Sequence, residues 1–446
     1  MIAFLTEQVK KLAFENKVLN EKISLLINGG KSTTSSTPPS HDLGRSNKKN
    51  SRIITGRKTG GQSGHEGTTL AMKVIPDQVI DYAPCCCSSC GANMEDVDAT
   101  ATERKQEVEL PPIAIKYVEH IAHSKTCTRC GTVNEAVLPA HLTAPVQYGH
   151  SIAAQVVYLS VYQYLPYKRV VRLFADLYGL PISEGTIDNM LQSSMEKALP
   201  VYHQIQKKLE ETKVVGADET GCRIGGKKGW IHTWQNETLT FLAASMNRGY
   251  ATVEKYFPDG FKGIIVSDCW AAQLKTPASK HQLCVVHLLR ELTNFIDALA
   301  CKWSVELKQL LKDAIDLKHQ LKREEYGLPH QGVMALEKRL EVLLNLGLAE
   351  TNRHQKIQAF IKRLVKHKNS IFTFLHHYYV PADNNGAEKA IRNVKVKTKV
   401  SGQFRSEKGA TRFAVLRSVV DTSIKNAQIA YNAILVLQFI APPTPT

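Results

Sequence analysis

Two short apolar runs that each end in an aspartate constrain the fold of this chain most strongly. One run, 213–218, ends at Asp218, and the other, 262–268, ends at Asp268. Each is typical of a buried strand, and open α/β sheets gather their ligands at the carboxyl ends of such strands. One aspartate in such a place is usually a turn residue or a cap. Two of them predict a shared acidic site.

A third acidic residue, Glu388, lies in a predicted helix that starts after Pro381 and an Asp-Asn-Asn run able to cap free amides. At 100° per residue, Arg392, Lys395 and Lys399 fall on the same helix face as Glu388. This arrangement suits a metal ligand beside a track of phosphates, which the three cations would contact. The alternative is a solvated helix in which Glu388 pairs with Arg392. Together with Asp218 and Asp268, Glu388 could hold two Mg²⁺ (or Mn²⁺) ions about 3.5–4 Å apart and act on a phosphate.

Several further motifs follow one another along the chain: 216–220, 229–232, 267–270, 281–292, 383–392 and 401–410. With these motifs the chain resembles a bacterial DDE transposase of the TnpC type, from the insertion-sequence family numbered sixty-six, over about residues 1–430. The resemblance implies a ribonuclease H-like domain that cleaves DNA at the ends of an insertion sequence and transfers the strands. It implies Asp218, Asp268 and Glu388 as catalytic residues. The expected partners are double-stranded DNA at element ends and target, and accessory transposition proteins.

The net charge of +16 favours a polyanionic partner, although a ribosomal or membrane-surface protein could share it. No stretch has the roughly 20 apolar residues of a membrane span, and no signal peptide is recognisable at the start. The ten cysteines include Cys-x-x-Cys pairs, which indicate zinc and a reducing compartment. We therefore expect a cytoplasmic, nucleoid-associated bacterial protein.

Residues 1–28 have the heptad pattern of a coiled coil, with Leu at every d position and Asn16 at one a position. This pattern predicts a parallel homodimer, and the alternative is one amphipathic helix packed on its own body. Residues 29–74 form a basic linker rich in Gly, Ser and Pro. Within it, Arg57 and Lys58 are assigned to DNA, although the segment could simply connect domains.

Residues 75–145 are predicted to form a zinc-binding domain. Two matched Cys-x-x-Cys-Gly turns would supply four thiolates to a structural Zn²⁺, namely Cys87, Cys90, Cys127 and Cys130. Cys86 could compete for one ligand place. Between the two turns, 104–110 and 113–120 are predicted to be strands.

The remaining boundaries complete a multidomain α+β fold. We predict a helical region at 146–210, in which 167–198 is either a helix-turn-helix or two ordinary packing helices. The first part of the ribonuclease H-like α/β catalytic domain is 211–296. A large helical insertion, 297–380, follows it. The Glu388 helix and the next segment, 381–430, complete the catalytic domain, and 431–446 is a tail without the extension expected of the family.

Some residues in these motifs have other interpretations. His281, Cys284 and His287 have ligand-like spacing, but the apolar residues among them favour a buried strand entering a helix. Glu291 is a rival to Glu388 as the third acid. Gln403, Arg405 and Ser406 belong to a matching motif without an assigned role.

Two other functions fit part of the same evidence. A repressor or architectural protein could use the coiled coil, the zinc domain and the basic linker without catalysis. A ribonuclease H-like nuclease or resolvase could cut DNA without transferring strands.

Overall fold

The structure is a computed structural model that describes residues 70–99, 103–110, 113–350 and 354–440. The predicted coiled coil at 1–28, and Arg57 and Lys58 in the linker, lie outside the described residues. The described chain divides into two compact units, one ending at Lys116 and the other starting at Tyr117.

The first unit contains the first cysteine turn. Among its described residues, the only β pairing is an isolated bridge between Cys86 and Asn93. The predicted strands at 104–110 and 113–120 are wrong, because neither range has strand pairing. Val108 and Leu110 in the first range are 75% and 90% exposed, so no face of it is buried. A two-stranded hairpin without a body to pack against is at best marginally stable in water.

The second unit begins with a short hairpin of β1 (Ser124–Thr126) and β2 (Val133–Glu135), which flanks the second cysteine turn. A helical region follows, as predicted: α2 (His150–Val157), which continues into a π-helical turn at Tyr158–Tyr162, then α3 (Tyr167–Tyr178) and α4 (Glu184–Glu210). Gly179, with φ +60°, ends α3, and the hydroxyl of Ser183 accepts the amide of Thr186 to cap α4. Because α4 is 27 residues long and buries residues from Ile187 to Leu209, it is first of all a packing helix.

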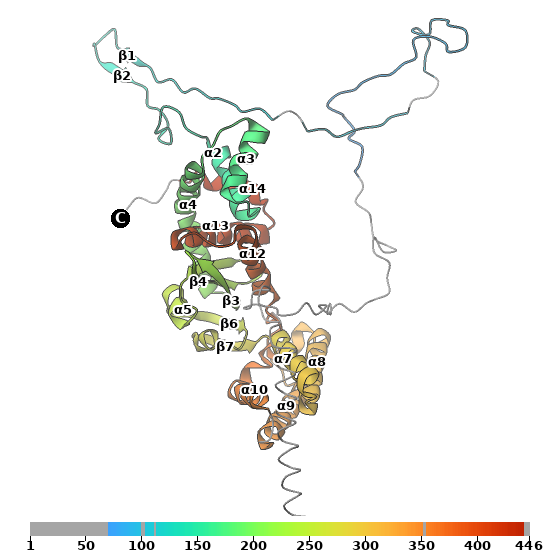
Figure 1. The fold of residues 1–446 in the computed structure, drawn as a ribbon, viewed down its shortest axis with the longest axis vertical. Coiled ribbons are helices and arrows are strands. Elements are labelled where there is room, and N and C mark those ends of the chain that lie inside the picture. Colours follow the sequence, from blue (N-terminus) through green and yellow to red (C-terminus); the bar gives the residue numbers. More distant parts are fainter. Residues whose placement is uncertain (1–69, 100–102, 111–112, 351–353, 441–446) are drawn as a thin grey trace, which may run out of the picture. The chain divides into compact units, whose positions relative to one another are not determined.

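The centre of this unit is a five-stranded mixed sheet (Figure 1). Its strands, in the order β5-β4-β3-β6-β7, are β5 (Thr240–Ser245), β4 (Lys227–Gln235), β3 (Val214–Ile224), β6 (Phe261–Ser267) and β7 (Ala278–Leu283). The first three are antiparallel, whereas β6 and β7 run parallel to β3. The helix α5 (Tyr250–Tyr256) separates β5 from β6, and α6 (Ala271–Lys275) separates β6 from β7. The predicted order of three strands, a helix and a fourth strand is confirmed.

The predicted helical insertion is also confirmed as helical. The helix α7 (Val285–Leu299) begins before the predicted boundary at 297 and leads into the insertion. The insertion contains α8 (Lys302–Gln320), α9 (Gln331–Ala349), α10 (Gln355–Lys366) and α11 (Thr373–His376), with 3-10 turns at Arg323–Glu325 and Lys368–Ser370. Its buried core includes Leu307, Leu343 and Phe360 and continues to Val266 and Leu283 at the β6–β7 side of the sheet. The insertion is therefore packed onto the sheet.

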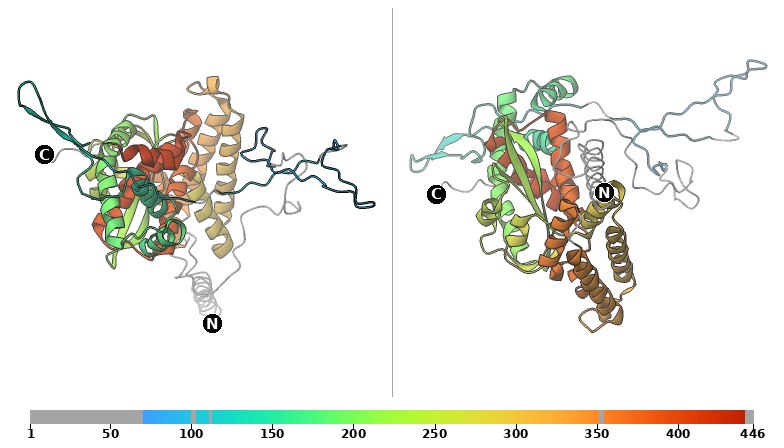
Figure 2. Two further views of the ribbon diagram at one scale, coloured as in Figure 1. Left: turned by 90° about the horizontal axis from the view of Figure 1, so that it is seen from above. Right: turned by 60° about the horizontal axis from the view of Figure 1, so that its bottom comes forward.

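Helices cover both faces and one edge of the sheet (Figure 2). The helix α12 (Asn385–Ser401) lies against β3 and β4, and Tyr202 of α4 stacks on Phe241 of β5. The helix α13 (Glu407–Lys425) lies along β5, where Ser418 and Thr422 accept strand amides of Leu242 and Thr240. A covered edge cannot pair with another chain. The last described helix is α14 (Ala430–Leu437).

Candidate functional site

Asp218 and Asp268 lie on adjacent parallel strands. The β3–β6 pairing ends with Gly216 opposite Val266, so the same register continued by two residues sets Asp218 beside Asp268. Asp268 directly follows β6, as predicted. The prediction that Asp218 ends its strand is wrong, because β3 continues to Ile224 through its hairpin with β4. Relative to β6, however, Asp218 still lies just past the end of the parallel pairing.

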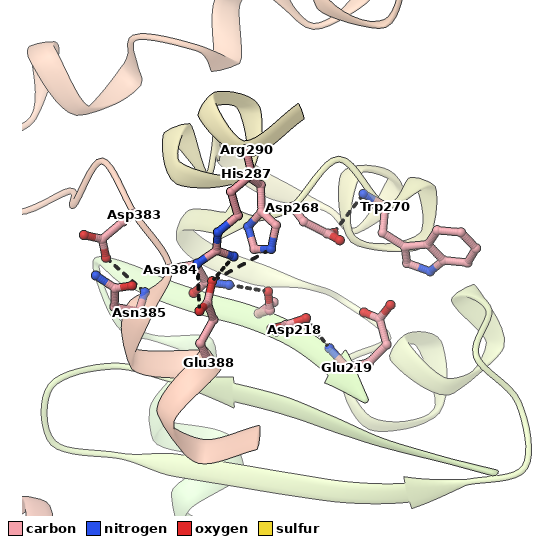
Figure 3. A network of polar contacts seen from close by, with 11 residues as sticks. Asp218, Glu219, Asp268, Trp270, His287, Arg290, Asp383, Asn384, Asn385 and Glu388 are labelled. Atoms are coloured by element: carbon pink, nitrogen blue, oxygen red, sulfur yellow. Dashed lines mark hydrogen bonds and ion pairs between the residues drawn. The ribbon is translucent and has the colours of Figure 1, made fainter. Parts of the chain in front are cut away.

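Glu388 lies in the first turn of α12, which is held against β3 by Asn384 (Figure 3). The buried Asn384 side chain donates a hydrogen bond of 2.7 Å from Nδ2 to the carbonyl of Ala217, the residue before Asp218. Its backbone carbonyl accepts the amide of Glu388 at 3.2 Å. Asp383, the residue before the N-cap Asn384, accepts the amide of Asn385, the first residue of the helix. Asn384 thus joins the Glu388 helix to the Asp218 strand.

Close packing at two glycines maintains this contact. A Cβ on Gly216 would lie 2.5 Å from Asn384 Oδ1, and one on Gly386 would overlap Gln235 Nε2. Both contacts would be closer than real Cβ contacts, so α12 can approach the strands this closely because these positions are glycine. An open cavity of about 1070 Å³ borders this contact, and its lining contains none of the three carboxylates.

The carboxylates of Asp218, Asp268 and Glu388 are close enough to influence one another electrostatically. Burial raises the pKa of Asp218 well above its ordinary value, and the charges of Asp268, Glu219 and Glu388 raise it further. Asp218 Oδ1 accepts the amide of Glu219, whereas the buried Oδ2 has no hydrogen-bond partner. A buried, unpartnered carboxylate oxygen beside other carboxylates fits a site for divalent cations with oxygen ligands. Within the described ranges, no group of three or more His, Cys, Asp or Glu side chains is arranged to hold a metal ion.

Two basic residues of α7, His287 and Arg290, face Glu388 (Figure 3). Arg290 donates to Glu388 Oε1 at 3.2 Å and to Oε2 at 3.5 Å, and His287 Nε2 lies 3.8 Å from Oε1. The predicted strand-to-helix transition at 281–287 is correct, since β7 ends at Leu283 and α7 begins at Val285. Sequence reasoning treated His287 as a packing residue and so missed this contact. The spacing of His287 and Arg290 on one helix face is the signal that could have identified it.

Glu219 forms a second buried acidic position next to Asp218. Its Oε1 accepts bonds of 3.0 and 2.9 Å from Arg248, whose guanidinium stacks on the ring of Trp270 at 3.7 Å. Burial raises the pKa of Glu219 to about 7, with a further contribution from the charge of Asp268. Sequence analysis did not single out either Glu219 or Arg248.

The rival acid Glu291 forms an ion pair of 2.7 Å with Arg363.

The three cations predicted on the Glu388 face differ in exposure. Arg392 and Lys399 are exposed, whereas Lys395 is half-buried. Burial lowers the pKa of Lys395, and the negative charges of Asp218 and Glu388 oppose that shift. The charged head of Lys395 therefore lies within electrostatic reach of Asp218 and Glu388.

The two cysteine turns have the same local geometry, as their matched sequences predict. In each turn the glycine, Gly91 or Gly131, has φ above +70° and donates its amide to the carbonyl of the first cysteine at 2.9 Å. Amides of Ser89 and Cys90 lower the pKa of Cys87, and the side chain and amide of Thr132 lower that of Cys130. Both turns thus favour the thiolate form that zinc requires. Cys87 and Cys90 belong to the first unit, and Cys127 and Cys130 to the second.

Comparison with known proteins defines the class of this chain. The zinc-finger binding domain of transposase IS66 matches residues 84–131, which include all four cysteines. The class is therefore that of transposases with an N-terminal zinc-finger domain. The family described as "Transposase IS66 family" matches residues 145–412, which include Asp218, Asp268 and Glu388. The chain belongs to the IS66 transposase family, as its resemblance predicts.

A curated relative from Sinorhizobium fredii, described as "Uncharacterized protein y4jD", is 20% identical over 399 residues. The similarity covers 82% of this chain and 76% of that protein. No helix in the described part of the chain is both long enough and apolar enough to cross a membrane.

Proposed function

We propose that this chain is a DDE transposase that cleaves double-stranded DNA at the ends of an insertion sequence and joins the freed 3′ ends to target DNA. The observation that carries the proposal is the buried Asp218 carboxylate, whose Oδ2 has no hydrogen-bond partner and whose pKa is raised by the nearby charges of Asp268 and Glu388. The strand order and the α12 position support a ribonuclease H-like catalytic domain.

Asp218, Asp268 and Glu388 would hold two Mg²⁺ or Mn²⁺ ions. When bound, the two ions supply activation of the attacking oxygen and stabilisation of the leaving oxygen in a phosphate displacement. Arg290 and His287, which contact Glu388, would orient its carboxylate and meet the DNA strand beside it. Lys395 would neutralise the phosphate nearest the acidic residues, and Arg392 and Lys399 those further along α12.

The N-terminal regions would serve binding and assembly. Cys87, Cys90, Cys127 and Cys130 would hold one structural Zn²⁺, with which the lowered pKa values of Cys87 and Cys130 agree. Arg57 and Lys58 would contact DNA, and the heptads of residues 1–28 would join two copies as a parallel homodimer. Accessory transposition proteins would be further partners, and the protein would associate with the bacterial nucleoid.

The test compares Glu388→Gln with Glu291→Gln on a labelled duplex that carries the end of the element. We expect Glu388→Gln to lose cleavage in Mg²⁺ while still binding the duplex, because Gln removes a metal ligand and keeps the size of the side chain. Glu291→Gln controls for loss of an acidic side chain that contacts Arg363 instead. Full cleavage by Glu388→Gln would refute the assignment of the third acid. A parallel assay with pre-cleaved ends separates a transposase from a nuclease, since only the transposase joins them to a second duplex.

A further inference from the structure

The last residue of α12 and the loop that follows it, together 401–406, are joined to the tip of the β3–β4 hairpin, 223–228. The amide of Gly225 donates to the carbonyl of Phe404 and the amide of Phe404 to that of Arg223, both at 2.9 Å. Gln403 Oε1 accepts the amide of Gly226 at 3.0 Å. We call these two segments together the paired-loop platform.

The platform is firmly anchored to the body of the unit. The Phe404 ring is buried and lies 5.4 Å from the ring of Phe413 in α13. Ser406 accepts the amide of Gly409 and caps α13. Gly225 and Gly226, with φ of +56° and +79°, form the tight hairpin turn that fits against the loop. These contacts explain why Gln403 and Ser406 occur in the motif.

The surface of the platform is positively charged. Its four charged side chains are all exposed cations, namely Arg223, Lys227, Lys228 and Arg405. Neither segment contains an acidic residue, and the next residue, Glu407, starts α13. Among the ion pairs of the described chain, none involves these four cations. Exposed Arg172, in contrast, is paired with Asp176. Four exposed cations without an ion pair, held on an anchored support, fit the phosphates of a nucleic-acid backbone.

The position of the platform relates it to the acidic site. The start of α12 contacts Gln235, which is opposite Gly216, and the loop after α12 contacts Ile224, so the helix runs along β3. From Glu388 to Ser401 the helix rises about 20 Å, and from Asp218 to Ile224 the strand also advances about 20 Å. Arg392, Lys395 and Lys399 occupy the helix between these ends. Cations therefore extend from the acidic site to the platform over the length of about six base pairs of duplex DNA.

We propose that the paired-loop platform is a second DNA-contact site, which binds the backbone of the duplex about six base pairs from the bond that is cut. This inference rests on the proposed function, because it takes the acidic site as the place of cleavage. The ligand is the phosphate backbone of double-stranded DNA.

The experiment measures binding of the full chain, in Ca²⁺ to prevent cleavage, to two end duplexes by fluorescence anisotropy. One duplex extends about three base pairs beyond the cut on the platform side and the other about twelve, so only the longer one reaches the platform. We expect wild type to bind the longer duplex more tightly. The triple variant Arg223→Gln/Lys227→Gln/Arg405→Gln should bind both duplexes with the same affinity. The slope of its log affinity against log salt concentration should be smaller in magnitude by about two to three, since each lost phosphate contact removes about 0.9 from that slope.

The matched control is Lys312→Gln/Lys338→Gln/Lys362→Gln, which removes three exposed cations from the helical insertion and should keep the gain. Because Arg223 also donates to the carbonyl of Gly226, Lys227→Gln/Lys228→Gln provides a second variant that leaves the turn intact. If wild type and both platform variants gain equally in affinity from the longer duplex, the platform inference is overturned while the proposed function stands. The same holds if wild type binds both duplexes with equal affinity. Wild type that binds neither duplex would instead overturn the proposed function.

Discussion

Replacing Asn384 tests whether the contact between α12 and β3 positions Glu388. Asn384→Ala removes the 2.7 Å bond to Ala217 and leaves that carbonyl with one partner fewer in a buried place. Loss of such a bond costs about 1–3 kcal/mol. For a unit of the size of Tyr117–Thr446 the melting temperature should fall by about 1–5 °C.

The effect on function should be larger than the effect on stability. Glu388 is one helical turn beyond Asn384, so freeing the helix start displaces its carboxylate from Asp218 and Asp268. A displacement of about 1 Å in a catalytic group can cost about 100-fold in rate. We therefore expect cleavage to fall by about that factor and the Mg²⁺ concentration for half-maximal thermal stabilisation to rise.

Asn385→Ala is the matched control, since Asn385 is the next residue and is exposed. Its stability should change by no more than about 0.5 kcal/mol, because its amide still reaches Asp383. If Asn384→Ala lowers the melting temperature but binds Mg²⁺ like Asn385→Ala, Asn384 contributes packing only and the positioning role is refuted.

Four further outcomes are expected. Arg290→Gln should lower, by several-fold, the Mg²⁺ concentration needed for thermal stabilisation, because Glu388 loses its ion pair and a nearby positive charge; an unchanged or higher concentration would contradict this. In the metal-free protein, folding raises the pKa of Glu219 from 4.5 to about 7, so the folded state holds more protons in that window and this group's stabilisation is lost as pH rises through it. Denaturant unfolding should therefore show that the free energy of unfolding of Glu219→Gln, relative to that of wild type, rises by about 3 kcal/mol between pH 4 and pH 8. A difference between the two proteins that does not change with pH would contradict the raised pKa. Purified protein should contain one Zn²⁺ per chain, and Cys127→Ser/Cys130→Ser should remove it; a full zinc content in that variant would exclude these ligands. Deleting residues 1–27 should halve the mass measured by light scattering at micromolar concentration, and an unchanged mass would mean that another surface forms the dimer.

Local features of the sequence were sufficient to predict the elements that carry the acidic residues. The β-branched runs before Asp218 and Asp268 form strands, Ser183 caps α4, and Asp383 accepts the first amide of α12, because periodicity and helix-start chemistry act over a few residues. The two Cys-x-x-Cys-Gly turns likewise form as predicted, since the positive φ of Gly91 and Gly131 is a local requirement. Alternation alone was not sufficient at 104–110 and 113–120, where the described residues have no strand pairing.

Tertiary structure alone decided how the acidic residues are surrounded. Asp218 and Glu388 are separated by 170 positions, and α12 approaches β3 through Asn384, Gly216 and Gly386, whose fit no local pattern reveals. The start of α7 is joined to the segment before α12 by the bond from the Val285 amide to the Ala382 carbonyl, and Arg290 and His287 of α7 reach Glu388. Pairing of two remote loops creates the basic platform. Sequence periodicity reports which face of an element is buried. Which element then covers that face depends on the shapes of side chains far apart in the chain, and these meet only in the folded protein.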